Sequence, residues 1–196
     1  MSSLKSEIEN LLSAIITSVR TGESVNNFAN PYGLLGLVST VGEAANIPKS
    51  ERMGYLFPDG VPTSKAEAEK YLTTITVKAY DGNGNARDLK ITVHKKLAEE
   101  VKMVYDELYQ IKFPVSDSGG YNYRNMTKSN KLSHHSYGVA IDLNASSNPF
   151  GGTNNKNSKF YNNDEVVAIW KKHGFYWGGD WNNSRNDPMH FTYTGY

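Results

Sequence analysis

Apolar residues recur at two spacings along the chain, and the changes of spacing predict the order of its elements. Residues 4–19 carry apolar side chains three or four positions apart, between Ser3 as a candidate N-cap and Gly22 beyond the end, which predicts an amphipathic helix. Glycine and proline interrupt residues 22–63 too often for long regular elements. We expect a loop-rich arm there, with one short helix near residues 34–41.

The middle of the chain changes from helical to strand patterns and back. A capping-box pattern at residues 63–67 predicts a short helix that ends near Leu72. Two alternating, β-branched segments follow at residues 73–80 and 89–93 with a glycine-rich turn between them, which predicts a hairpin. Residues 97–108 return to helical spacing and predict a helix that packs on this hairpin.

Beyond Pro114 the chain is rich in glycine, asparagine, tyrosine and tryptophan, which favours short strands joined by polar loops. Residues 139–143 and 189–193 read as strands, and residues 165–172 read as a helix that ends at Gly174. The expected fold class is α+β, with a small antiparallel sheet, flanking helices and long loops. We expect residues 1–62 to form an N-terminal helix and arm, and residues 63–196 to form the main domain.

Composition excludes several classes of site and partner. The 196 residues include no cysteine, so a metal site must use histidine, aspartate or glutamate, and disulfides and thiol nucleophiles are excluded. The net charge is +1 and no long basic run is present, which argues against nucleic acid as a partner. No apolar window approaches the roughly 20 residues that span a membrane, and the N-terminus has no signal-peptide pattern.

Two short segments of the C-terminal part carry candidate chemistry. In the first, His135 stands before a glycine turn, and Asp142 lies at the far end of a short apolar strand. In the second, strand alternation places His190 on the face opposite Met189 and Phe191.

Two imidazoles and one carboxylate from neighbouring strands predict a zinc site with three protein ligands and an open position for water, as in hydrolytic zinc sites. Asp187 lies three residues before His190, close enough to take a proton from that water and pass it to a leaving amine. The residues therefore indicate amide hydrolysis.

These segments resemble the signature of the VanY-type D-alanyl-D-alanine carboxypeptidase and L-alanyl-D-glutamate endopeptidase family of zinc peptidases, which includes phage-endolysin-like peptidoglycan peptidases. The signature is Ser-x-His-x-x-Gly-x-Ala-x-Asp followed by acid-x-x-His, and its positions here are Ser133, His135, Gly138, Ala140, Asp142, Asp187 and His190. The resemblance implies that Zn²⁺ is the cofactor, that His135, Asp142 and His190 are its ligands, and that Asp187 is the catalytic base. His134 is expected to be a loop residue.

The resemblance extends over roughly residues 56–193. It implies that Arg124 meets the substrate or stabilises the developing oxyanion. Ser133, Tyr137 and Trp181 are candidate substrate contacts, although Ser133 can equally be a loop hydrogen-bonder and the two aromatic residues can equally be packing residues.

The function that follows is a zinc-dependent peptidoglycan hydrolase that cuts the stem peptide. An aspartate as base and the Trp-Gly-Gly-Asp-Trp segment at residues 177–181 favour the L-alanyl-D-glutamate endopeptidase over the alternative D-alanyl-D-alanine carboxypeptidase. An alternative of another class is a non-catalytic, zinc-containing wall-binding or particle-assembly module. The expected place of action is the bacterial cell wall, reached through a holin, on a phage particle or by precursor processing, with residues 1–62 as a candidate docking segment for a phage particle or secretion apparatus.

Overall fold

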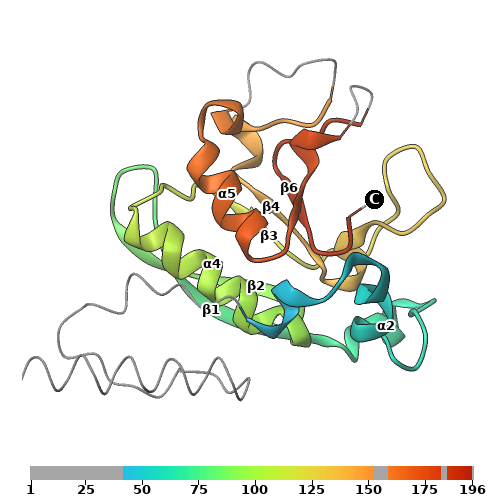
Figure 1. The fold of residues 1–196 in the computed structure, drawn as a ribbon. Coiled ribbons are helices and arrows are strands. Elements are labelled where there is room, and N and C mark those ends of the chain that lie inside the picture. The colour runs from blue at the N-terminus through green and yellow to red at the C-terminus, as the bar shows by residue number, and fades with distance from the viewer. Residues whose placement is uncertain (1–41, 152–158, 182–184, 196) are drawn as a thin grey trace, which may run out of the picture. The chain divides into compact units, whose positions relative to one another are not determined.

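The domain contains two antiparallel sheets, a hairpin of β1 (Leu72–Tyr80) with β2 (Ala86–His94) and a four-stranded sheet (Figure 1). The computed structural model describes residues 42–151, 159–181 and 185–195. The helices expected at residues 4–19 and 34–41 lie outside this described part. The expected α+β class with small antiparallel sheets is confirmed.

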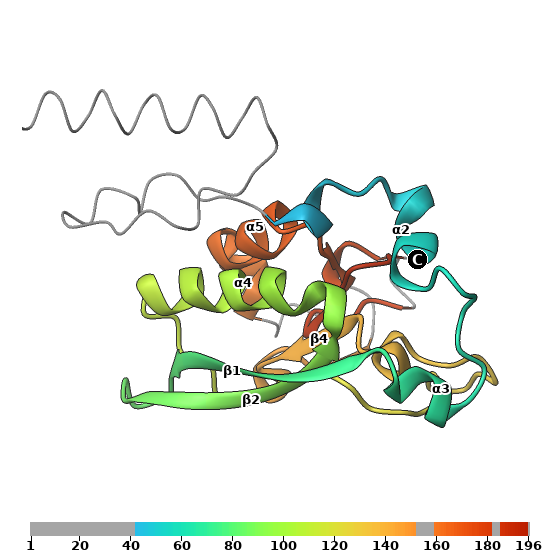
Figure 2. The same cartoon turned by 90° about the horizontal axis from the view of Figure 1, so that it is seen from below.

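The hairpin presents one apolar face to helix α4 (Ala98–Gln110), which runs along it (Figure 2). Alternate residues of β1 are buried, among them Ile75 and Val77, and the residues between them are exposed. Such alternation leaves one face of a two-stranded sheet in solvent and covers the other. The hairpin and the helix predicted from residues 73–108 are confirmed, with their ends extended by a few residues.

The second sheet has the strand order β3-β4-β6-β5 and carries helix α5 beside it (Figure 1). Every adjacent pair in it is antiparallel. Its elements are short: β3 (Ser118–Gly119), β4 (Ala140–Leu143), α5 (Asp164–Lys172), β5 (Tyr176–Trp177) and β6 (His190–Thr192). Strands β4 and β6 and helix α5 match the sequence expectation, whereas β3 and β5 are too short to leave a pattern.

One aromatic core joins the two sheets. Trp170 of α5 is fully buried and stacks on Phe191 of β6 at 4.8 Å between ring centroids. The ring of Tyr105 from α4 meets Trp170 edge-on at 6.1 Å. Because Phe191 faces this core, its neighbour His190 is turned to the opposite face. Met189 precedes β6 and lines the same cleft as His190, so the alternation expected between these two residues begins only at His190.

Short helices connect the longer elements. Helix α3 (Lys65–Glu69) begins at Ser64, whose hydroxyl accepts a hydrogen bond from the Glu67 amide, as the capping pattern predicts. It ends before Leu72, because β1 begins there. The other short helices are α2 (Arg52–Leu56) and 3-10 turns at residues 43–46, 49–51, 95–97, 134–137, 145–147, 159–162 and 178–180.

Residues 42–57 form a strap that is fixed to the C-terminal part of the chain by Arg52. The buried guanidinium donates to the carbonyl oxygens of Gly174 and Tyr193, each at 2.5 Å, and to that of Ile47 at 2.9 Å. Its Cζ also lies 4.3 Å from the ring centroid of Tyr193. The glycine- and proline-rich composition predicted a loop here, and α2 forms because this tertiary contact outweighs local propensity.

Candidate metal and peptidase site

The first histidine segment is a single 3-10 turn between a serine cap and a left-handed glycine. Ser133 Oγ accepts a hydrogen bond from the His135 amide, and Gly138 ends the turn with φ of 66°. A Cβ at Gly138 would lie 2.5 Å from the Leu72 side chain and 2.8 Å from the His94 amide nitrogen. Glycine therefore serves both the backbone angle and the close approach to the hairpin.

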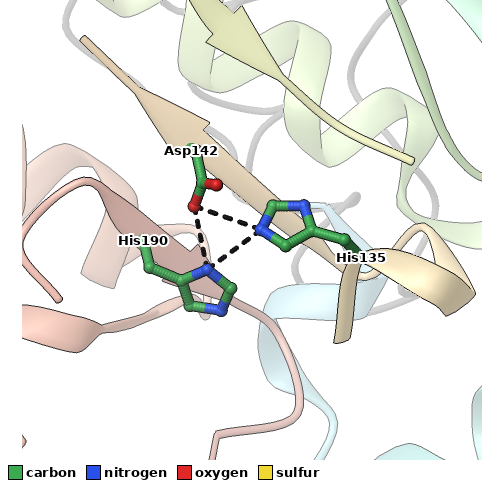
Figure 3. Close-up of side chains that lie close together, drawn as sticks. All are labelled: His135, Asp142 and His190. Carbon is green, nitrogen blue, oxygen red and sulfur yellow. Dashed lines mark hydrogen bonds and ion pairs between the residues drawn. The ribbon is translucent and has the colours of Figure 1, made fainter. Parts of the chain in front are cut away.

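The register of β4 and β6 brings the other two candidate ligands together. Asp142 pairs directly with His190 across the two strands, so both side chains leave the same face of the sheet. His135 reaches this face from the turn that precedes β4. The three residues are shown in Figure 3.

Three potential ligand atoms converge at this point. Asp142 Oδ1 lies 2.9 Å from His190 Nδ1 and 3.1 Å from His135 Nε2, and the two nitrogens are 3.1 Å apart (Figure 3). Both histidines are buried, and the Asp142 side chain is 23% exposed. Within the described ranges, no other group of three or more His, Asp or Glu residues is arranged to hold a metal ion.

The donor set fits a zinc ion. His135 Nδ1 donates to the carbonyl oxygen of Gly120 at 2.7 Å, so its Nε2 carries the free lone pair that faces Asp142 and His190. Tetrahedral zinc with bonds of 2.0–2.1 Å holds neighbouring ligand atoms about 3.3 Å apart, close to the separations found here. Three ligands from the protein leave one coordination position open.

Electrostatics keep these groups in their metal-binding forms. Burial alone would raise the pKa of Asp142, but hydrogen bonds with His135 and His190 outweigh burial and lower it. Burial lowers the pKa of His190, which favours the neutral imidazole that binds metals.

Asp187 lies beside the cluster and is held by backbone contacts. Its amide donates to Gly178 O at 3.0 Å, and a Cβ on Gly178 would lie 2.3 Å from Asp187 O. Burial and the charge of Asp142 raise the pKa of Asp187 to about 7, against the opposing effects of His135 and Arg124. Its buried Oδ1 has no hydrogen-bond partner among the described residues, so this carboxyl can hold or accept a proton near neutral pH.

A cleft of about 990 Å³ opens onto this centre. Every candidate from the sequence except buried His135 lines it: Arg124, Ser133, Tyr137, Asp142, Trp181, Asp187 and His190. The indole of Trp181 lies 5.3 Å from the His190 ring, and Tyr137 also packs against Phe57 at 5.8 Å. The two motifs and the upstream arginine therefore meet in one cavity.

Several residues around this site gave no signal in the sequence. Ser136 is fully buried, and its hydroxyl forms two hydrogen bonds with the Arg124 backbone. It accepts one from the Arg124 amide at 2.9 Å and donates one to the Arg124 carbonyl oxygen at 2.7 Å, which fixes the backbone that carries the arginine. His134, expected to be a loop residue, lines the cleft and pairs with Thr192 Oγ1 at 2.8 Å. Burial, followed by the charges of His190 and His135, lowers the pKa of His134 to about 4.

Comparison with known proteins gives one finding. Residues 127–193 match a family model described as D-alanyl-D-alanine carboxypeptidase, which confirms the resemblance to this family of zinc peptidases. The matched segment begins downstream of residue 56, where the resemblance in the sequence starts, and it contains both histidine segments. Searches of curated proteins and of solved structures gave no match.

Proposed function

We propose that the segment matching D-alanyl-D-alanine carboxypeptidases forms the centre of a zinc-dependent peptidase that hydrolyses an amide bond of the peptidoglycan stem peptide. The observation that carries this proposal is the convergence of His135 Nε2, Asp142 Oδ1 and His190 Nδ1 within about 3 Å of one another. Beside them lies Asp187 Oδ1, which has no hydrogen-bond partner among the residues that the structure describes. A purely structural ion pair would not require three potential ligand atoms that converge at one point beside an open cleft.

His135, Asp142 and His190 would hold the metal. A bound Zn²⁺ supplies a Lewis acid and lowers the pKa of water to near neutrality. The carboxylate of Asp187 would take a proton from the attacking water and pass it to the leaving amine. Arg124 lies in the same cleft, where its guanidinium can bind a substrate carboxylate or the oxygen that becomes negative during attack.

The side chains that line the cleft supply the candidate substrate contacts. Trp181 and Tyr137 present aromatic surfaces against which a peptide can pack, and the Trp181 ring also contacts the His190 ring. Ser133 contributes through the turn cap that orients His135 and through the cleft wall. We assign these three residues to substrate binding.

We propose that the bond cut is L-alanyl-D-glutamate, because an aspartate stands at the base position and a Trp-Gly-Gly-Asp-Trp segment forms the turn that contacts it. The D-alanyl-D-alanine carboxypeptidase activity is the second candidate, and the description of the matched family favours it. Mass spectrometry of digested muropeptides separates them: a new L-alanine carboxyl terminus supports the endopeptidase, and released D-alanine supports the carboxypeptidase.

A non-catalytic wall-binding or assembly module remains the alternative of another class. It predicts that incubation with purified peptidoglycan releases no new free amino groups, whereas the peptidase predicts that they are released and that a chelator abolishes the release. No helix of the described ranges is long and apolar enough to cross a membrane. We propose action on the bacterial cell wall, with delivery by holin, phage particle or precursor processing. Residues 1–62 are the proposed docking segment, and within it residues 42–57 pack on the rest of the domain through Arg52.

A further inference from the structure

We propose that Lys128, Lys131 and Arg185, here called the cationic rim, bind a second carboxylate of an acidic peptide substrate, away from the bond that is cut. The inference rests on the proposed function and specifies its substrate class. All three side chains line the same cleft as the His135, Asp142 and His190 centre, and all three residues are exposed.

Positive and negative side chains occupy different parts of the cleft lining. Among the described residues, its lining contains four cationic side chains, those of Arg124 and the rim, and two carboxylates, Asp142 and Asp187. Both carboxylates lie at the centre, since Asp142 contacts the two histidines and the carbonyl oxygen of Asp187 accepts a hydrogen bond from the His190 amide at 3.0 Å. The chain carries a net charge of only +1, so this excess of positive charge around the cleft is local.

No acidic side chain of the described residues balances the charge of the rim cations. In the part of the chain that the structure describes, no acidic side chain forms an ion pair with Lys128, Lys131 or Arg185. Lysines elsewhere, such as Lys102 and Lys171, do pair with neighbouring acids. Unpaired cations that line one cavity attract an anionic ligand and raise its local concentration there.

The backbone at Lys128 makes this position suitable for a matched glycine substitution. Lys128 has φ of 58°, a left-handed conformation that glycine and asparagine adopt far more readily than lysine. It lies in a hairpin closed by the bridge between Asn125 and Leu132 and by the hydrogen bond from Ser129 N to Met126 O (yellow loop in Figure 1). Lys112 adopts the same conformation away from the cleft, so the role of Lys128 rests on its place in the cleft lining and not on the angle alone.

The inner and outer cations have different tasks. The backbone of Arg124 is hydrogen-bonded to Ser136, the neighbour of His135, so Arg124 is anchored beside the centre. The rim is then available for a carboxylate one or more residues away along the peptide. A cleft of about 990 Å³ is at the upper end of ordinary ligand pockets, about 300–1,000 Å³, and has room for several residues.

The test uses two synthetic peptides that contain the same L-alanyl-D-glutamate bond. In both, the γ-carboxyl of the D-glutamate is linked to a lysine with an acetylated side chain. The terminal carboxylate of this lysine is free in one peptide and amidated in the other. The whole protein, loaded with zinc, is expected to cleave the free acid with a kcat/KM roughly three- to tenfold above that of the amide, the size of one or two exposed ion pairs. Lys128→Gly, Lys131→Gln and Arg185→Gln, singly and together, should move this ratio toward one.

Lys112 provides a matched control. It is a second lysine with positive φ, 53°, at the end of α4, and it does not line the cleft. Lys112→Gly and Lys128→Gly should both have a Tm equal to or above that of the parent protein, because each relieves the backbone, but only Lys128→Gly should change the substrate ratio. A ratio of one in the parent protein, or an unchanged ratio in the triple variant, overturns the proposal.

Failure of the proposed function is distinguishable from failure of the rim. If neither peptide is cut, the binding of both peptides to the metal-free protein is measured by calorimetry. Tighter binding of the free acid than of the amide, with this difference lost in the triple variant, supports the role of the rim even without catalysis. A soluble glycerol-phosphate polymer tests whether the rim prefers phosphate to carboxylate. If this polymer still binds in the presence of either peptide, and the two peptides bind equally, the rim does not recognise the peptide carboxylate and the proposal is overturned.

Discussion

Asp142 Oδ1 lies 2.9 Å from His190 Nδ1, between residues that pair directly across β4 and β6 although 48 positions separate them in the chain. Their alignment is a consequence of strand register, since a slip of one residue would turn either side chain to the opposite face. The core contact of Trp170 with Phe191 holds this register from the other side of the sheet. Packing in the core is therefore coupled to the geometry of the candidate metal site.

The two adjacent histidines test the ligand assignment. His135→Gln is expected to lose zinc on dialysis, because Nε2 of this residue faces the other two donors. His134→Gln should keep zinc near full stoichiometry, because its ring pairs with Thr192 rather than with the cluster. Metal analysis of both purified variants makes the comparison. Equal zinc content in the two would contradict the assignment of His135.

Asp187→Asn separates the proton-transfer role from metal binding. The amide has nearly the same shape but cannot accept a proton, so turnover should fall by roughly 10²–10⁴-fold. Zinc content should remain that of the parent protein, because Asp187 is outside the ligand cluster. Both quantities are measured on one preparation with a stem-peptide substrate. Parent-like turnover would remove Asp187 from the proposed mechanism.

Gly138→Ala should destabilise the fold, because the new methyl group would lie 2.5 Å from the Leu72 side chain at a left-handed φ of 66°. We expect a loss of about 2–4 kcal/mol in the free energy of unfolding, measured by urea titration. Gly84→Ala is the control. Gly84 also has positive φ, 82°, but nothing lies within 4 Å of its Cβ position, so only the conformational cost of about 1 kcal/mol should appear.

Removal of the Arg52 side chain should release the strap from the C-terminal part of the domain. Arg52→Ala leaves three backbone carbonyls without their donor and is expected to cost about 3 kcal/mol of stability. Lys49→Ala serves as the control, since Lys49 is an exposed residue of the same strap whose ammonium group lies 5.0 Å from the Tyr176 ring centroid. Equal losses in the two variants, measured by urea titration, would contradict this role of Arg52.

Local sequence patterns predicted the elements that rest on many repeated contacts. The hairpin, α4 and α5 follow apolar periodicity, and Ser64 caps α3 as its spacing to Glu67 suggests. The strap was not predictable, because α2 depends on the contact of Arg52 with a carbonyl 141 positions away. Strands of two residues, such as β3 and β5, are defined by their partners and leave no periodic signal.

The candidate site was predictable where spacing along a turn or strand places a side chain. His135 and Asp142 belong to one segment, and the face of His190 follows from strand alternation once β6 begins. The supports of the site were not predictable, because Ser136 and Gly120 act through contacts that depend on how loops meet in space. The rim likewise depends on a cleft that brings Lys131 and Arg185 onto one surface.

The stability of the domain should depend on pH through His173, which lies buried between two glutamates of α4. Its Nδ1 is 2.5 Å from Glu100 Oε1, and its Nε2 is 2.6 Å from Glu107 Oε1. Burial would lower the pKa of His173, but hydrogen bonds and charge interactions with Glu100 and Glu107 outweigh burial and raise it above the usual 6.5. The charged imidazolium therefore favours the folded state.

Because the folded-state pKa of His173 exceeds its unfolded value, this stabilisation is fully present below about pH 6.5 and declines as pH rises through the folded-state pKa. His173→Gln removes the titrating group, so the difference in unfolding free energy between parent and variant should be largest at pH 6 and shrink toward pH 9. Urea titrations across this range measure that difference directly. A difference that stays constant or grows with pH would mean that His173 is neutral in the folded protein and that α4 and α5 are joined there by neutral hydrogen bonds alone.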